Sequence, residues 1–230
     1  MRLLAKLDTK SNFVIKGVQL EGVQKLAPIG QVLHRLSLVG VQEFCLTDTM
    51  ASLYSRNSLA PVIQDHTSDF RYPICAGGGI KSLDDAKSLI LAGADRISVN
   101  THALENPSFI GVLTEYLGNS CVVSQMDVRK IDGAFYLFSH AGRERSSYSI
   151  SKWLEFLYTR PVGEILVTSI DRDGTRKGVD WELIELLEKE SPIPYIYSGG
   201  LKSVDELNSL SDLKMISGVA ALSCFIDDLV

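Results

Sequence analysis

One short pattern occurs twice in this chain, and it constrains the fold more than any other feature. Residues Tyr72–Ser82 read YPICAGGGIKS, and residues Ile193–Ser203 read IPYIYSGGLKS. Each copy is an apolar run long enough for a buried strand, closed by consecutive glycines and followed by a helical pattern. Glycine lets backbone amides approach an anion closely at a helix N-terminus. Two ordinary tight turns would explain either copy alone, but two copies in matching context favour a phosphate site at both.

The pattern belongs to a longer repeat. Asp8 and Asp127 each end an apolar, strand-like run and lie 119 residues apart, and the central glycines Gly78 and Gly199 lie 121 residues apart. A near-constant offset indicates an internal duplication. Each half supplies four strand–helix units, which predicts a single (β/α)₈ TIM barrel built from two half-barrel repeats. A doubly wound open sheet is the alternative, but it does not explain a repeat of half the chain.

The half-barrels are expected at about 1–118 and 119–230, within one domain that spans 1–230. The pattern predicts strands over Arg2–Asp8, Glu43–Asp48, Ile74–Gly77, Arg96–Asn100, Cys121–Asp127, Glu164–Ser169, the second glycine run and Met215–Ser223. It predicts helices over Pro28–Val39, Leu59–Phe70 and Ser149–Thr159, another that begins at Asn106-Pro107, and hairpins at Val14–Gly17 and Asp132-Gly133. Because only Cys224–Val230 follow the last strand, the eighth helix is expected to be truncated.

Composition narrows the class of protein. The 230 residues carry a net charge of −5 and 45% hydrophobic side chains, which is typical of a globular protein with a large core. The acidic balance argues against a nucleic-acid partner, and no apolar run reaches the ~20 residues of a membrane span. No signal-peptide pattern is present, which predicts a cytoplasmic protein. The four cysteines (Cys45, Cys75, Cys121, Cys224) form no Cys-x-x-Cys pair, so we expect reduced core thiols, with no metal and no cofactor.

In a barrel of this kind, active sites lie at the C-terminal ends of the strands. Those predicted ends carry polar side chains or glycines at Asp8, Asp48, Gly78, Gly79, Asn100, Thr101, Asp127, Thr168, Ser169, Ser198, Gly199, Gly200 and Ser223. Asp8 and Asp127 end the first and fifth strands, on opposite sides of the barrel mouth. Two carboxylates that face one substrate can divide acid and base roles if their environments separate their pKa values. Two strand-end aspartates that bind loop amides are the alternative interpretation.

The glycine turns end strands three and seven, and the ends of strands four and eight extend them. Such turns would bind two phosphates on opposite sides, which implies an elongated substrate with a phosphate at each end and a reacting centre between them. In the loop Ser169–Thr175, Asp173-Gly174 can aim a backbone amide at the second phosphate, while Thr168 reaches the centre. A solvated acidic loop is the alternative interpretation.

The opposite end of the barrel carries alternating charges at strand starts. The residues are Arg2, Glu43, Arg96 and Glu164, on strands one, two, four and six. Two positive and two negative side chains predict a salt-bridged ring on the barrel floor. A structural plug is the default interpretation of such a ring. The functional interpretation is a gate into the barrel axis.

Several of these residues resemble one known family. They are Leu7-Asp8, Ile15-Lys16-Gly17, Gly77–Ile80, Val99-Asn100-Thr101, Asp127 and above all Gly163–Thr175, which reads GEILVTSIDRDGT. Together they resemble the cyclase subunit of imidazole glycerol phosphate synthase, HisF, from Arg2 to about Phe225. The resemblance implies a (β/α)₈ barrel that takes ammonia from a glutaminase subunit in a heterodimer. It also implies a bis-phosphorylated ribulosyl aminoimidazole carboxamide nucleotide as substrate, with imidazole glycerol phosphate and AICAR as products, in histidine biosynthesis.

The resemblance also implies roles for single residues. Asp8 and Asp127 would be the general acid/base pair. The two phosphates would be bound by Gly78, Gly79, Asn100 and Thr101 at one end, and by Asp173, Gly174, Gly200 and Ser223 at the other. Further substrate contacts would come from Lys16, Asp48, Thr168 and Ser198. Arg2, Glu43, Arg96 and Glu164 would form the ammonia gate, and Asp95 would contact the glutaminase.

The chain departs from the family pattern in places. Gln24–Ile29 replaces an Arg-Asp-x-Gly-Asp-Pro stretch in the first active-site loop, and Ala141 replaces a serine. Leu20–Gly22 and Met50–Asn57 resemble a divergent branch found with surface-polysaccharide genes, which leaves an ammonia-relay subunit for sugar amidination as an alternative. The sister isomerase of the histidine pathway is a third candidate. Asn100-Thr101 and the charged floor favour the cyclase over that isomerase.

Overall fold

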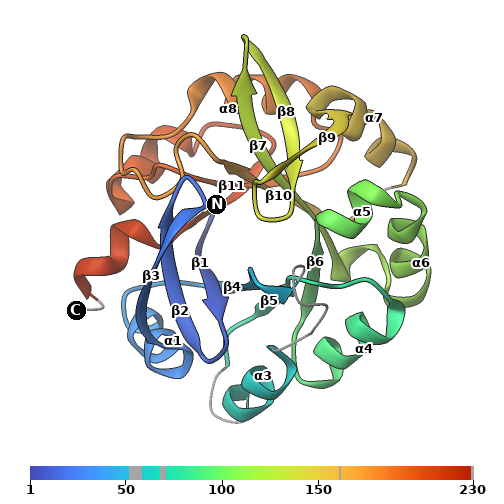
Figure 1. The fold of residues 1–230 in the computed structure, drawn as a ribbon. Coiled ribbons are helices and arrows are strands. Elements are labelled where there is room, and N and C mark those ends of the chain that lie inside the picture. Colours follow the sequence, from blue (N-terminus) through green and yellow to red (C-terminus); the bar gives the residue numbers. More distant parts are fainter. Residues whose placement is uncertain (52–58, 68–70, 161, 229–230) are drawn as a thin grey trace.

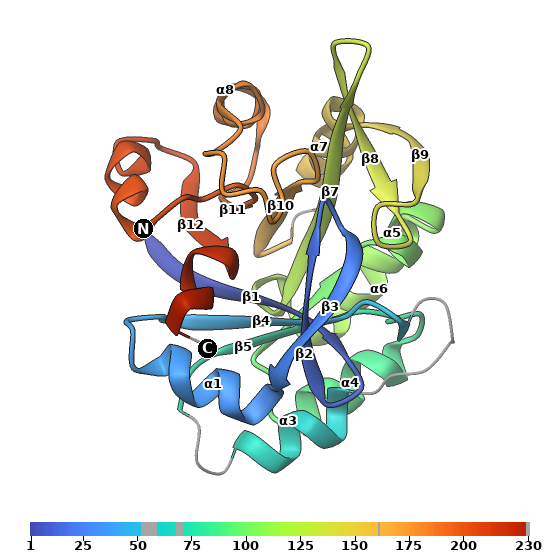
Figure 2. The same ribbon diagram turned by 60° about the vertical axis from the view of Figure 1, so that its left-hand side comes forward.

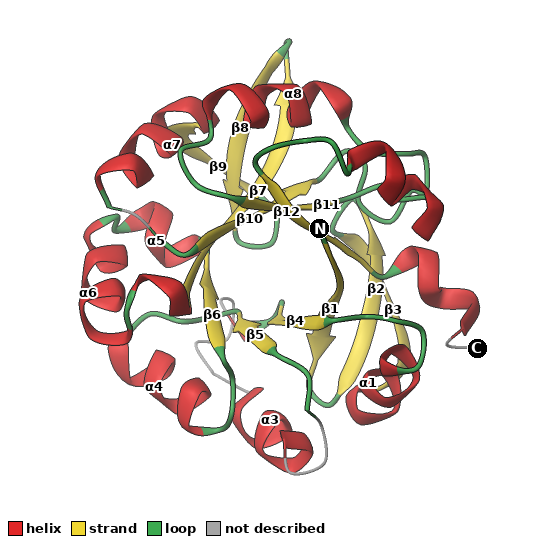
Figure 3. Cartoon of the chain, turned by 180° about the vertical axis from the view of Figure 1, so that it is seen from behind, coloured by secondary structure: helices red, strands yellow, loops and turns green. Residues whose placement is uncertain are grey.

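Eight parallel strands close into a barrel, which confirms the predicted fold class. The computed structural model describes residues 1–51, 59–67, 71–160 and 162–228. The barrel strands are β1 (Arg2–Lys10), β4 (Glu43–Asp48), β5 (Ile74–Gly77), β6 (Arg96–Val99), β7 (Val122–Ile131), β10 (Glu164–Ser169), β11 (Tyr195–Ser198) and β12 (Ile216–Ala221). They pair in this order, and the ring closes where β12 pairs with β1 and β7 with β10. Figure 3 shows the closed ring of strands with helices around it.

Helices cover the outside of the barrel (Figure 1). The α-helices are α1 (Ile29–Ser37), α3 (Leu59–Thr67), α4 (Leu83–Leu91), α5 (Thr101–Glu105), α6 (Ser108–Leu117), α7 (Ile150–Thr159) and α8 (Trp181–Glu190). The described residues also form the 3₁₀ helices η1 (Asn119–Cys121), η2 (Val204–Leu210) and η3 (Ser223–Asp228). The short η3, which contacts α1, stands where an eighth helix would lie. Parts of the predicted helix Leu59–Phe70 and of the Met50–Asn57 segment lie outside the described residues.

Several strand ends differ from the sequence predictions. The strands predicted to end at Asp8 and Asp127 continue to Lys10 and Ile131. Ser223, also predicted as a strand end, begins η3.

Three further predictions need correction. Asn100, predicted as a strand end, is the N-cap of α5, a helix that the sequence pattern did not reveal. The second glycine run is followed by the 3₁₀ helix η2 rather than by an α-helix. There the Glu206 carboxylate accepts the amides of Lys202 and Val179, and so ties the segment to the loop before α8. The predicted helix Pro28–Val39 begins after an unpredicted strand, β3 (Glu21–Pro28).

Two antiparallel hairpins extend barrel strands one and five beyond the ring. β2 (Phe13–Val18) and β3 continue from β1, and β8 (Ala134–Ser139) and β9 (Glu144–Ser149) continue from β7. The predicted Asp132-Gly133 turn joins β7 to β8, with positive φ angles of 49° and 82° that such a tight turn requires. Figure 2 shows the β7–β8 hairpin rising beyond the barrel. Both hairpins therefore start at the ends of the strands that carry Asp8 and Asp127.

Side chains alternate along each barrel strand between the outer core and the lumen. On β1, Leu3, Ala5 and Leu7 belong to the large apolar core beneath the helices, whereas Leu4 belongs to a separate cluster inside the barrel. That inner cluster consists of Leu4, Cys45, Cys75, Val123, Leu166, Ile196 and Ala220. Period-two alternation of parallel strands accounts for the separation. The lumen is thus layered, with charged residues at the floor, an apolar middle and polar residues at the mouth.

The outer core holds β7 in place. Trp153 of α7 is fully buried, and its indole Nε1 donates to Ser124 Oγ of β7 at 3.1 Å. The Trp153 ring also stacks on Phe156 at a centroid distance of 5.0 Å. Large buried aromatic side chains dominate core energetics, so this contact fixes the strand that presents Asp127.

None of the helices in the described ranges is long and apolar enough to cross a membrane.

The two copies of the glycine motif allow a matched stability test. Ser82 Oγ accepts the Asp85 amide at 3.2 Å, and the Asp85 carboxylate accepts the Ser82 amide at 2.9 Å, which forms a capping box on α4. The equivalent Ser203 makes no capping hydrogen bond. We expect Ser82→Ala to lower the free energy of unfolding by about 1 kcal/mol. Ser203→Ala should change it by less than ~0.5 kcal/mol in the same urea titration; equal losses would contradict the capping assignment.

Candidate active site

Two pockets lie side by side at the barrel mouth and share two residues. The first is lined by Asp48, Gly78, Gly79, Asn100, Thr101, Asp127 and His140 among others. The second is lined by Lys16, Asp173, Gly174, Arg176, Ser198, Gly200 and Ser223 among others. Lys6 and Asp8 line both. The predicted carboxylate pair therefore lies at the junction of the two glycine pockets.

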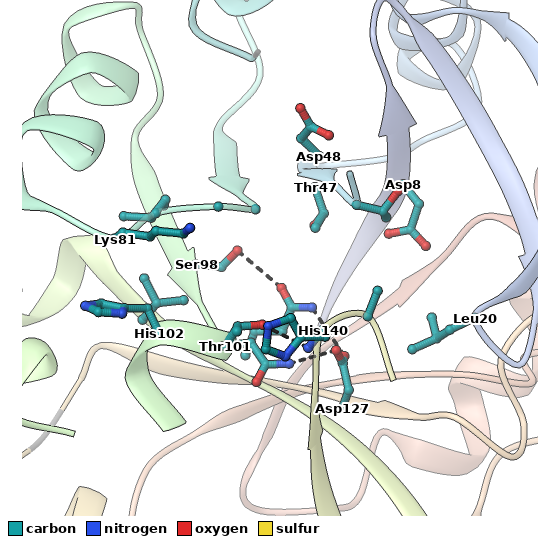
Figure 4. A pocket seen from close by; sticks show the side chains of 18 of the residues that line it. Asp8, Leu20, Thr47, Asp48, Lys81, Ser98, Thr101, His102, Asp127 and His140 are labelled. Carbon is teal, nitrogen blue, oxygen red and sulfur yellow. Dashed lines mark hydrogen bonds between the residues drawn. The ribbon is translucent and has the colours of Figure 1, made fainter. Parts of the chain in front are cut away.

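Asp127 is the more buried member of that pair. Asn100 Nδ2 donates to Asp127 Oδ2 at 2.8 Å, and Gln125 Nε2 donates to Asp127 Oδ1 at 3.2 Å. Figure 4 shows these contacts, together with the Ser98–Gln125 hydrogen bond behind them. Burial raises the pKa of Asp127 to about 6, even though Lys6 and the hydrogen bonds from Gln125 and Asn100 oppose the rise. A carboxyl group with this pKa can exchange a proton near neutral pH.

Asp8 enters the site from the end of β1 and has a cation as its partner. Lys6 Nζ lies 3.2 Å from Oδ1 and 3.3 Å from Oδ2 of Asp8. The Asp8 side chain is 20% exposed, whereas that of Lys6 is 5% exposed. The two aspartates thus have different surroundings. Asp8 lies in an ion pair, whereas Asp127 is buried and held by side-chain amides. This difference is what a division of acid and base roles requires.

The first glycine pocket depends on the absence of side chains. Gly78 has φ +96°, and a Cβ there would lie 2.2 Å from the Asp48 carbonyl oxygen. Gly79 has φ +67°, and its Cβ would meet Ala51 at 2.5 Å. Thr101, at the start of α5, uses Oγ1 to accept the His140 amide at 3.0 Å. The backbone at Gly78 and Gly79 therefore cannot adopt this shape with any other residue.

The second glycine pocket is built in the same way. A Cβ on Gly200 (φ +80°) would lie 2.3 Å from Gly178 O, and one on Gly174 (φ +69°) would lie 2.4 Å from Gly17 O. Lys16 of β2 and Arg176 add cationic side chains to the lining. Cationic side chains next to the open backbone of a glycine turn are suited to bind an anion.

The backbone amide of Asp173 is already used in a hydrogen bond within its own turn. Its amide donates to Ser169 O at 2.9 Å inside its own turn. Burial raises the pKa of its carboxyl group, and nearby Asp8 adds to this while Lys6 opposes it. Asp173 thus brings a third carboxylate to the junction of the pockets.

The remaining predicted mouth residues lie where the strands end. Asp48 is buried, and its Oδ1 accepts the Met50 amide at 3.0 Å. Thr168 is the register neighbour of Asp127, and its Oγ1 is buried without a hydrogen-bond partner among the described residues. Thr47, the register neighbour of Asp8, has the same property. Buried unpaired hydroxyls are uncommon. Thr47 lines the first pocket, whereas Thr168 is fully buried and lines neither pocket.

The first hairpin spans the mouth. Gln19 of the β2–β3 turn donates its backbone amide to Asp173 O at 2.9 Å and its side-chain amide to Asp171 O at 3.1 Å. The adjacent Leu20 lines the first pocket (Figure 4). The hairpin is thereby fastened to the loop after β10, between the two pockets.

The four floor charges form a closed ring, as the sequence predicts. Arg2 pairs with Glu43 at 2.8 Å and Arg96 with Glu164 at 2.6 Å, while Arg2–Glu164 and Arg96–Glu43 complete the ring. The arginines and Ser217 lower the pKa of Glu164 against the opposing effect of burial. Each carboxylate is thus shared by two guanidinium groups.

Among the described residues, no three or more His, Cys, Asp or Glu side chains are placed so that they could hold a metal ion.

Comparison with known proteins identifies the family. A family model described as "Histidine biosynthesis protein" matches residues 2–228. The chain belongs to this family. Imidazole glycerol phosphate synthase subunit HisF of Legionella pneumophila is 37% identical over 209 residues, which cover 90% of this chain and 99% of that protein. HisF of Sulfolobus acidocaldarius is 35% identical over 230 residues, or 100% and 91% of the two chains. HisF of a Thermotoga species is 34% identical over 199 residues, or 86% and 79%.

Several site residues of this histidine biosynthesis family member were not singled out from the sequence. They are Lys6, Thr47, Gln125, His140 and Arg176. Lys6 and Gln125 each precede a predicted catalytic aspartate by two residues, so strand alternation places them on the same face. That spacing was a usable signal. No comparable signal marked His140, which reaches the first pocket through the hairpin.

Both pockets should bind an anion. Crystals soaked in sulfate are expected to hold one ion near Gly78, Gly79 and Thr101, and a second near Gly174 and Gly200. Gly78→Ala should remove the first ion and leave the second, because its Cβ would clash with Asp48 O. Density in only one pocket of the wild type at saturating sulfate would contradict the two-anion arrangement.

Proposed function

We propose that this protein is the cyclase subunit of imidazole glycerol phosphate synthase. In this role it uses ammonia to convert the bis-phosphorylated ribulosyl nucleotide to imidazole glycerol phosphate and AICAR. One observation carries the proposal: Asp8 lines both glycine pockets, and Asp127 faces the first of them. A substrate with a phosphate in each pocket would place its middle against both carboxylates. The relatives named as synthase subunits support the same reaction.

The carboxylate pair would supply general acid–base catalysis. Asp127, with a pKa of about 6, is suited to donate and recover a proton during turnover. Asp8, which lines both pockets, would act as the partner base. The Thr47 hydroxyl, which lies beside Asp8 and lines the first pocket, would bind the substrate there.

The lumen would carry ammonia to this pair. A ring of four charges at the floor is a costly plug, because desolvated ion pairs rarely stabilise more than well-packed apolar side chains do. An opening ring would admit a small polar molecule, and the apolar layer above it would favour neutral ammonia over ammonium. Glu43 is buried and Arg2 is partly exposed, so the ring can be reached from the floor side.

The floor surface is suited to a partner that produces ammonia, which we propose to be a glutaminase. Large apolar side chains are exposed where helices lead into barrel strands, at Leu38, Leu91, Tyr116 and Tyr158. The segments that enter barrel strands lie on the floor side, around the ion-pair ring. Asp95, next to Arg96, is also exposed there. A partner docked over the charged entrance would cover these exposed apolar side chains.

The other candidates receive less support. The relatives reported above carry synthase names, and none of those names refers to a surface polysaccharide. The altered stretch Gln24–Ile29 lies mostly in β3, where Lys25 pairs with Ile15 and packs its ammonium over the Phe13 ring. The stretch therefore forms hairpin structure in this chain, and we propose no separate function for it.

Removal of either carboxylate should stop catalysis. Asp8→Asn and Asp127→Asn are each expected to lower ammonium-driven turnover by ~10²–10⁴, the usual contribution of a general acid or base. Asp132→Asn, at the exposed β7–β8 turn, is the matched control and should leave turnover unchanged, since Asn tolerates positive φ. Turnover would be followed with purified protein, ammonium salts and the ribulosyl substrate. A wild type inactive in this assay would overturn the proposed function.

Charge reversal at the floor should separate the two nitrogen sources. Asp95→Lys is expected to abolish glutamine-driven turnover in the presence of the glutaminase and to retain ammonium-driven turnover. Because Asp95 Oδ2 also accepts the Ile74 amide at 2.8 Å, Asp95→Asn keeps that acceptor and isolates the effect of charge. Glu185→Lys, on the exposed face of α8, is a control that should affect neither rate. Equal losses of both rates in Asp95→Lys would argue against this docking surface.

A further inference from the structure

The mouth contains one buried cation that the proposed reaction leaves without a role. Lys6 lies on β1 two residues before Asp8, so both side chains enter the lumen from the same face of the strand. Its Nζ contacts both carboxylate oxygens of Asp8, and Lys6 lines both glycine pockets. The ammonium group is therefore next to the position of the reacting centre.

The surroundings keep Lys6 charged. Burial by itself favours the neutral amine, but the carboxylates of Asp8, Asp173 and Asp127 outweigh it and raise the pKa of Lys6 above its ordinary value. A permanently protonated amine cannot attack a carbonyl group, so Lys6 does not act as a nucleophile. Its contribution must be electrostatic.

The same ammonium group acts unequally on the two catalytic carboxylates. It forms a direct ion pair with Asp8, whereas Asp127 is held by the amides of Asn100 and Gln125 and has no direct ion pair among the described residues. Lys6 still acts on Asp127 through space, and it is the largest influence that opposes the rise in the pKa of Asp127. Lys6 thus binds Asp8 directly and limits the rise in the pKa of Asp127.

We propose that Lys6 is a positioning residue that makes the two carboxylates unequal: it holds Asp8 in a direct ion pair, whereas Asp127 is held by amides and is left to donate the proton. The catalytic meaning of this inference rests on the proposed function, but the electrostatic arrangement can be tested without substrate. Further titratable or charged side chains line the two pockets around these groups. They are Lys16 on β2, Asp48 on β4, Lys81 after β5, His102 and Glu105 on α5, His140 after β8, and Asp173 and Arg176 after β10.

The test is a titration of Asp127 by ¹³C NMR with carboxyl-labelled aspartate, with Asp127→Asn used to assign the signal. The wild-type midpoint is expected at about 6. Lys6→Met keeps the length of the side chain and removes its charge, so the midpoint should rise by at least about one unit, as expected when a neighbouring opposite charge is lost. Lys6→Arg restores the charge and should return the midpoint towards the wild-type value. Lys10→Met, exposed on the same strand, should leave it unchanged.

Asp8→Asn gives an opposite shift and does not depend on how well Lys6→Met folds. It removes a negative charge near Asp127 and leaves Lys6 in place, so the Asp127 midpoint should fall. An unchanged midpoint in folded Lys6→Met, or a rise in Asp8→Asn, would overturn the role of Lys6. In the ammonium-driven assay, the pH profile of Lys6→Met should shift in the same direction as its titration. If the wild type shows no turnover, the proposed function is overturned but the role of Lys6 is not, because the titrations decide that role.

Discussion

Closure of the sheet, with side chains that alternate along every strand, decides where each functional group of this protein lies. On β1, Arg2, Leu4, Lys6 and Asp8 enter the lumen in turn as floor charge, apolar layer, buried cation and mouth carboxylate. The residues between them face the helices and form the outer core. A shift of one residue in register would exchange the two sets, so the core and the site specify the same register.

Charges are balanced at the floor of the lumen, whereas carboxylates are in excess at its mouth. At the floor, two arginines and two glutamates satisfy one another in a closed ring. At the mouth, the carboxylates of Asp8, Asp127 and Asp173 gather around Lys6, and burial raises the pKa of Asp127 to about 6. A surplus of buried carboxylates is unfavourable for stability, and perturbed groups of this kind are concentrated at functional sites. The apolar middle layer keeps the two ionic systems apart.

Sequence reasoning succeeded where local signals and the fold agree. The strands Glu43–Asp48, Ile74–Gly77 and Glu164–Ser169 have the bounds that their apolar runs predict. It failed where a contact distant in sequence decides the local structure. β3 exists because β2 pairs with it, and η2 forms where Glu206 is bound to the loop before α8. The division into two half-barrels at about residue 118 stays a prediction.

The sequence by itself determined the eight-unit repeat, the barrel and the position of Asp8 and Asp127 at its mouth, because hydrophobic period and glycine turns are local properties of the chain. It did not show that both strands continue past these aspartates, to Lys10 and Ile131. Only the tertiary structure decided that Lys6 pairs with Asp8 and that Asn100 binds Asp127. The first contact depends on the rotamers of two side chains on one strand, and the second on how β6 and β7 are placed side by side. The pKa of Asp127 follows from them, since burial and neighbouring charge exist only once the barrel has closed.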